Sequence, residues 1–327
     1  MTEHKLGVFP GLTNEQYHTG PGVSKSSLDA IRKSPAHFKH SRTAERKGPT
    51  PAQRIGTMFH TIVLEPETFW DCYAKPFIAP DGALSTTADI IARLKEVDET
   101  LKTTGTKPAL TERLREVDPT AIFLDEAKAA HAASVGEKEI ITSEELAKVE
   151  AMRDAVMSHP IAGKLFAPGS GVAELSCYWI DGETGTLCRC RPDWWRHDGL
   201  IVDLKSALDA SPEGFPKSVA GWRYFVQDPF YQDGTAQAIE QGENPLGMKT
   251  PTAFIFVACE PVAPYPVGVY VVDQEGRELG RMKYREDLDT LAECIETDNW
   301  PAYSDKIESI SLPGWFLRRE EYETQEQ

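Results

Sequence analysis

Three ionisable residues at the ends of two consecutive strand-like segments have the types and spacing of a metal-dependent site. Asp193 ends the first segment, and Asp203 and Lys205 end the next one. Adjacent strands of this length can bring the two carboxylates within a few ångströms of each other, and Mg²⁺ prefers such hard oxygen ligands. The backbone carbonyl of Leu204 is a natural further ligand. Because alternate residues of a strand share a face, Lys205 is expected to project beside the metal.

This arrangement predicts hydrolysis of a phosphodiester. The two aspartates would hold a divalent ion, and the ammonium group of Lys205 would orient or deprotonate an attacking water, or stabilise the charge that develops on a phosphate. An Asp-x-Lys pattern is also common as a surface ion pair, so its weight depends on the residues around it.

Four further residues could support the site, and each has a plainer interpretation. Glu174 lies in the strand before the hairpin, where it either aims another carboxylate at the metal or is an ordinary exposed residue. His60 lies on an apolar helix, where a lone histidine is more often a core or boundary residue than a ligand. Gln227 and Tyr231 lie one helical turn apart on one face, either as part of the site or as a surface pair.

The elements that must position these residues change in character along the chain. Residues 7–80 form an N-terminal helical region, in which Arg54–Leu64 is a helix carrying His60. Strand patterns begin at Val172, and the order β-β-β-α-β-β-α after the helices predicts an α/β core with a mixed sheet flanked by helices. The expected strands are Val172–Ile180, Thr186–Pro192, Gly199–Leu204, Ala253–Ala258 and Val267–Val272, and the expected helices are residues 143–158, Phe225–Gln241 and Glu275–Thr297.

Residues 81–145 differ in amino-acid composition from the rest of the chain and are interpreted as an inserted helical subdomain. The run Ala92–Asp98 is echoed twenty residues later by Glu112–Asp118, which predicts two short amphipathic helices. The stretch Lys102–Leu114 is similar to the second half of a SAP-type DNA-binding motif. A solvated helical hairpin is the alternative, and the high charge of the segment favours it.

Composition limits the classes of protein that this chain can represent. Its 327 residues are 40% hydrophobic and carry a net charge of −16, which argues against a broad basic surface that coats DNA. A charged groove inside an acidic protein stays compatible with that value. No apolar run approaches the roughly 20 residues that span a bilayer, and the N-terminus lacks the apolar segment of a secretory signal. The sequence therefore predicts a cytoplasmic protein with no membrane partner.

Several segments of the sequence resemble the RecE-type exonucleases (exodeoxyribonuclease VIII) of the PD-(D/E)XK nuclease superfamily. The resemblance covers most of the chain and rests on the shared order and spacing of the segments. They are Tyr17–Ser26, Gly56–His60, Val63–Pro66, Cys188–Asp193, Val202–Ser206, Val226–Tyr231 and Ser311–Trp315.

The resemblance implies a fold and a set of site residues. The fold would be a restriction-endonuclease-like α/β core over residues 146–327, within one exonuclease domain over residues 1–327. The resemblance matches His60, Asp193, Asp203 and Lys205 to the family's catalytic set, Glu174 to an acidic residue ahead of the hairpin, and Gln227 and Tyr231 to a Q-x-x-x-Y motif beside the active site. Asp193, Asp203 and the Leu204 carbonyl would hold Mg²⁺, or Mn²⁺ as a substitute, with His60 and Glu174 assisting.

The resemblance also implies an activity and its partners. The family digests linear double-stranded DNA from the 5′ end, leaves a 3′ single strand for recombination, works with a RecT-like single-strand annealing protein and forms toroidal oligomers. Its members come from phages or prophages, so the location would be the cytoplasm of a bacterial host. Ser24 and Ser26 precede a helix whose free N–H groups favour anions, and they are expected to hold the 5′-terminal phosphate.

Two other functions fit the same residues. The first is another PD-(D/E)XK nuclease, such as an endonuclease or a Cas4-like enzyme. The second is a catalytically inactive DNA-binding or phage assembly module. The intact set of Asp193, Asp203 and Lys205 argues against the second function, because a binding module does not require three clustered ionisable groups.

Overall fold

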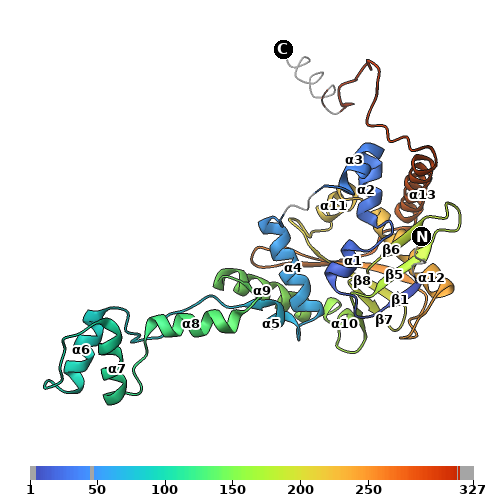
Figure 1. Ribbon diagram of the computed structural model, residues 1–327. Helices are drawn as coiled ribbons and strands as arrows, with labels where there is room; N and C mark the ends of the chain where they lie inside the picture. The colour runs from blue at the N-terminus through green and yellow to red at the C-terminus, as the bar shows by residue number, and fades with distance from the viewer. Residues whose placement is uncertain (1–4, 45–47, 315, 317–327) are drawn as a thin grey trace, which may run out of the picture.

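A mixed sheet of five strands lies at the centre of the computed structural model, which describes residues 5–44, 48–314 and 316 (Figure 1). Its strand order is β10-β9-β8-β7-β4, and only the β8–β9 pair is parallel. The strands are β4 (Gly171–Ala173), β7 (Trp194–Arg196), β8 (Leu200–Ser206), β9 (Ala253–Cys259) and β10 (Val267–Tyr270). This sheet confirms the expected α/β fold with a mixed central sheet.

Helices cover both faces of the central sheet. The first face is covered by α2 (Lys25–Lys33), α11 (Phe215–Gly221), α12 (Tyr224–Gln241) and α13 (Gln274–Thr297), and the second by α4 (Pro51–Leu64), α9 (Ser143–Ser158) and α10 (Ala162–Leu165). Alternation along β8 explains this sandwich. Ile201 packs in a cluster with Phe230 of α12, whereas Val202 and Leu204 pack in a second cluster with Val149 of α9. Asp203 therefore points toward α12.

One expected strand is divided and one strand was not expected, which corrects the sequence-based assignment. The segment expected as one strand over Val172–Ile180 is divided at Glu174, whose φ is 51°. The part before the break, β4, belongs to the central sheet, and the part after it belongs to a second sheet of three strands. The strand expected over Thr186–Pro192 ends at Cys190, so Asp193 does not end a strand but directly precedes β7, which was not expected. The second sheet has the order β1-β5-β6 and consists of β1 (Gly7–Phe9), β5 (Ser176–Ile180) and β6 (Leu187–Cys190).

The N-terminal region contains strands as well as the expected helices. β1 pairs with β5 and ties the start of the chain to the second sheet. The helix expected over Arg54–Leu64 is α4, which begins three residues earlier at Pro51. The other short elements of this region are α1 (Asn14–Thr19), α3 (Pro35–Ser41), α5 (Phe69–Cys72) and β2 (Tyr73–Ala74).

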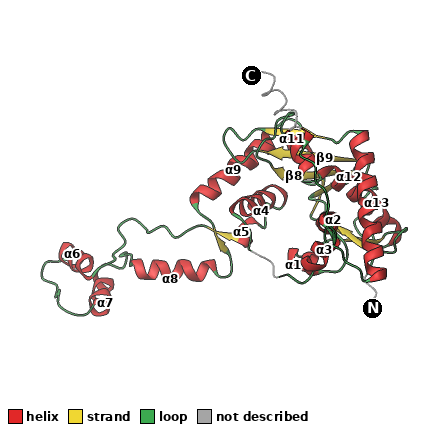
Figure 2. Cartoon of the chain, turned by 90° about the horizontal axis from the view of Figure 1, so that it is seen from above, coloured by secondary structure: helices red, strands yellow, loops and turns green. Residues whose placement is uncertain are grey.

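An arm projects from the body in both views (Figures 1 and 2). It leaves the body after β2 and returns at β3 (Glu139–Ile140), which pairs in parallel with β2. The two expected amphipathic helices are α6 (Thr87–Val97) and α7 (Lys107–Val117), and they share a small core of their own with Phe123. A third helix, α8 (Leu124–Val135), was not expected, because its alanine-rich sequence has no apolar stripe.

The described residues after α13, 298–314 and 316, extend beyond the body. Trp315, the last residue of the segment Ser311–Trp315, lies outside the described residues. Within residues 5–44, 48–314 and 316, we find no helix that combines the length and the apolar character needed to cross a lipid bilayer.

Candidate active site

His60, Glu174 and Asp193 converge where the two sheets separate. One potential ligand atom of each residue lies within 4.8 Å of those of the other two. His60 comes from α4, and the two carboxylates come from the points where the chain passes from one sheet to the other. The N–H of Glu174 donates to the carbonyl of Asp193 at 3.1 Å, so these two points are held together. The two passages between the sheets thus bring Glu174 and Asp193 to one point.

Contacts with β8 and α4 fix the Asp193 carboxylate. Its Oδ2 accepts a hydrogen bond from the Leu204 N–H at 2.8 Å and lies 3.6 Å from Nδ1 of His60. Burial lowers the pKa of His60 despite the nearby charge of Asp193 and a hydrogen bond to the Leu204 backbone. A histidine with a lowered pKa is neutral near pH 7, and the neutral ring is the form that binds a metal.

Asp203 and Lys205 lie on the face of β8 that is turned toward α12, opposite the face that carries Val202 and Leu204. The Asp203 Oδ1 accepts a hydrogen bond from Nε2 of Gln227 at 2.6 Å, and its Oδ2 forms an ion pair with the Lys205 ammonium. The ammonium also lies 4.7 Å from the ring centroid of Tyr224. Asp203 is 1% exposed and is not part of the group formed by His60, Glu174 and Asp193. It lies deeper, where it holds the lysine.

The donor set suits a hard divalent cation. Burial and then the Asp193 charge raise the pKa of Glu174 to about 8, and burial raises the pKa of Asp203 to about 7. Asp203 Oδ2 is buried and accepts no hydrogen bond of normal geometry, although Lys205 lies beside it. Carboxylate oxygens with one imidazole are ligands that Mg²⁺ and Mn²⁺ accept, and a cation would relieve the repulsion among the acids.

We expect metal binding to strengthen as the pH rises. Below a pKa of about 8, Glu174 is protonated in the metal-free protein, so an ion must displace that proton. The folded pKa lies above the ordinary value of 4.5, so the stability of the metal-free protein falls between these two pH values as the pH rises. Thermal melts with Mg²⁺ and with a chelator should show a larger metal-induced increase in Tm at pH 8.5 than at pH 6. Equal increases at both pH values would contradict this linkage, and Glu174→Gln should reduce the difference.

Two adjoining hollows of about 820 and 810 Å³ form a trough along which the site is open. Gln53, Gly56 and His60 line both hollows, so the two hollows adjoin at α4. Tyr231 lines the first hollow together with the metal ligands, and Lys205 lines the second. A long substrate lying in the trough would therefore pass the metal ligands and the lysine in turn.

Ser24 and Ser26 lie at the start of α2, and their hydroxyl groups hydrogen-bond to each other at 2.9 Å. Between them, Lys25 extends toward the lysine side of the trough. Its ammonium lies 5.7 Å from the ring centroid of Tyr224, which is also the ring beside Lys205. The beginning of α2 is therefore a neighbour of the Asp203–Lys205 pair.

Three residues of the site were missed by sequence reasoning. Arg191 forms an ion pair with Glu174, and its position two residues before Asp193 was the available signal. Glu65 lines the trough and raises the pKa of Glu174 further; it follows the helix that carries His60. No sequence signal marked Tyr224 as the ring beside Lys205.

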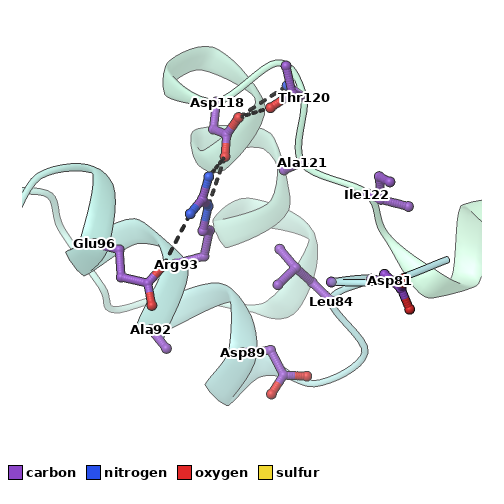
Figure 3. A pocket seen from close by; sticks show the side chains of 12 residues that line it. Asp81, Leu84, Asp89, Ala92, Arg93, Glu96, Asp118, Thr120, Ala121 and Ile122 are labelled. Atoms are coloured by element: carbon purple, nitrogen blue, oxygen red, sulfur yellow. Dashed lines mark hydrogen bonds and ion pairs between the residues drawn. The ribbon is translucent and has the colours of Figure 1, made fainter.

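A separate hollow of about 590 Å³ lies in the arm (Figure 3). Arg93 forms ion pairs there with Asp118 at 2.8 Å and with Glu96 at 3.2 Å. Asp118 also accepts a hydrogen bond from the Thr120 hydroxyl at 2.6 Å. These charged groups pair with one another, and the Arg93–Asp118 ion pair joins α6 to the end of α7.

Comparisons with known proteins bear on the family and the fold of the chain. Residues 24–313 match the family model described as "PDDEXK-like domain of unknown function (DUF3799)". A crystal structure of a "Putative exonuclease" from Eubacterium rectale has a TM-score of 0.51 and 11% sequence identity, and the match covers 94% of this chain and 98% of that one. The crystal structure of SSO0001 has a TM-score of only 0.26 at 11% identity, over 72% of this chain and 86% of that one. The search of curated proteins found no match.

Proposed function

Because the chain belongs to the family of the PDDEXK-like domain of unknown function, we propose that it is a Mg²⁺-dependent exonuclease acting on linear double-stranded DNA. The family match and the fold support a nuclease of the PD-(D/E)XK superfamily. The observation that carries the proposal is the convergence of His60, Glu174 and Asp193 beside the Asp203–Lys205 pair. A binding module would bury these ionisable groups at a cost without using them.

The residues have distinct roles in this proposal. His60, Glu174 and Asp193 would hold Mg²⁺, or Mn²⁺ as a substitute. The Leu204 carbonyl and Asp203, whose buried Oδ2 lies outside this group, would be the further ligands. When bound, the ion supplies a Lewis acid that offsets negative charge on the phosphate.

Lys205 would orient the attacking water and stabilise charge on the reacting phosphate. Asp203 and the Tyr224 ring hold its ammonium in place, and the amide of Gln227 holds Asp203 in turn. Tyr231 lines the wall of the trough beside the metal ligands.

The direction of digestion and the partners are also part of the proposal. The resemblance to RecE-type exonucleases favours digestion from the 5′ end, leaving 3′ single strands for a RecT-like annealing protein, and a toroidal homo-oligomer around the DNA. The neighbourhood of Lys25 and Lys205 supports a 5′-phosphate site near Ser24 and Ser26, because that phosphate would then lie close to the catalytic lysine.

A time course with end-labelled DNA tests the proposed function. We expect Mg²⁺-dependent loss of linear duplex, early release of a 5′ label and late release of a 3′ label, while closed circular duplex stays intact. Nicking or cutting of the circle would indicate an endonuclease instead. No degradation of either DNA, with Mg²⁺ or Mn²⁺, would overturn the proposal.

A further inference from the structure

Arg191 contacts both the backbone carbonyl and the side-chain carboxylate of Glu174. Its Nε donates to the Glu174 carbonyl at 2.9 Å and lies 3.0 Å from the carboxylate Oε2. The side chain of Arg191 is 10% exposed and that of Glu174 is 20% exposed, so water screens this pair weakly. Glu174 also has a positive φ of 51°, which residues other than glycine adopt rarely. One guanidinium thus restrains both the backbone and the side chain of a metal ligand.

The rest of the guanidinium is fixed to the N-terminal segment. Nη1 donates to Oδ1 of Asn14 at 2.9 Å, and Nη2 donates to the Leu12 carbonyl at 2.9 Å. The ring of Tyr17 lies 5.3 Å from the guanidinium carbon. All three nitrogens of Arg191 are therefore engaged within the chain, which argues against a role as a ligand for a DNA phosphate.

From these contacts we infer that Arg191 is a positioning residue that holds Glu174 in the orientation required for the metal ion. The inference rests on the proposed function for the identity of the ligand. Lysine cannot replace the arginine here, because its single ammonium cannot donate at the same time to the Glu174 carbonyl, Asn14 and Leu12. Loss of a partner that orients a metal ligand weakens metal binding by about 10- to 100-fold.

Arg189, which lies in β6, offers a matched control close to Arg191. It lies two residues before Arg191. Its guanidinium carbon is 4.8 Å from the centroid of the same Tyr17 ring, and its Nη1 donates to the carbonyl of Gly20 at 2.6 Å. Both arginines bind the N-terminal segment, Arg189 from within β6 and Arg191 from just beyond its end, but only Arg191 contacts an acidic ligand. Arg189→Lys should therefore lower thermal stability without changing the affinity for the metal.

Calorimetric titration with Mn²⁺ in the absence of DNA tests the inference, with Asp193→Asn identifying which binding event belongs to the site. We expect Arg191→Lys and Arg191→Ala to bind Mn²⁺ about 10- to 100-fold more weakly than the wild type, and Arg189→Lys to bind it normally. DNA degradation by Arg191→Lys should recover at high Mn²⁺ concentration. If Arg191→Ala does not fold, Arg191→Lys decides the test.

Two outcomes would overturn the role of Arg191. One is wild-type Mn²⁺ affinity in Arg191→Lys with a raised KM for DNA, which would make the residue a DNA ligand. The other is equal weakening by Arg189→Lys, which would indicate a purely structural effect. The proposed function fails separately: Mn²⁺ binding that depends on Arg191, in a wild-type chain that degrades no DNA, would preserve this inference and refute the nuclease.

Discussion

Lys205→Met is expected to slow the degradation of linear duplex DNA by about 10²- to 10³-fold, the usual cost of losing one group that stabilises charge in a transition state. Methionine keeps most of the length of the side chain but removes the ammonium that lies between Asp203 and the Tyr224 ring. Because the lysine is not a metal ligand, Mn²⁺ affinity should stay within a few-fold of the wild type. Single-turnover rates at saturating metal measure the effect.

Lys217→Met is the matched control for this substitution. Lys217 lies exposed on α11, so its loss removes the same charge from the protein without reaching the site. It should change the rate by less than about threefold, as expected for a surface charge that salt screens. Wild-type rates in Lys205→Met would refute the role of the lysine, and a loss of Mn²⁺ affinity would make it a structural residue.

The Asp203–Lys205 pair could be predicted from the sequence because its geometry depends only on the alternation of a strand. Residues two apart share a face in any regular strand, so the pattern alone placed the ammonium beside the carboxylate. The same rule explains the two covered faces of β8, since Ile201 and Val202 pack on opposite sides. The mixed central sheet could be predicted for a different reason, namely the order of the helices and strands along the chain.

The convergence of His60, Glu174 and Asp193 could not be derived from the same rule. It depends on a positive φ at Glu174 and on the two places where the chain passes from one sheet to the other. Neither feature leaves a periodic signal in the sequence. Arg191 was missed because its partners Leu12 and Asn14 lie 179 and 177 residues away along the chain. Helix α8 was missed because an alanine-rich helix in an arm needs no apolar stripe.

Asp193→Asn is expected to weaken Mn²⁺ binding by more than about 100-fold, since it removes a ligand itself and not merely the partner of a ligand. DNA degradation should fall below roughly 0.1% of the wild type, at or beyond the loss expected for Lys205→Met. The asparagine can still accept the hydrogen bond from the Leu204 N–H through its side-chain oxygen, so the fold should be kept. Titration calorimetry and the labelled-duplex assay measure the two losses.

The same substitution should raise the stability of the metal-free protein, which separates a lost ligand from a damaged fold. The Asp193 charge contributes to the raised pKa of Glu174, so its removal relieves repulsion in the folded state above pH 8. Melts in a chelator at pH 8.5 should give a Tm above that of the wild type, while Mg²⁺ should no longer raise it. Asp198→Asn, at an exposed acid paired with Arg196, is the control and should keep the metal-induced increase. If Asp193→Asn has lost activity and its Tm in chelator is below that of the wild type, Asp193 acts chiefly in folding. A metal ligand has the opposite effect, because its charge destabilises the fold when the metal is absent.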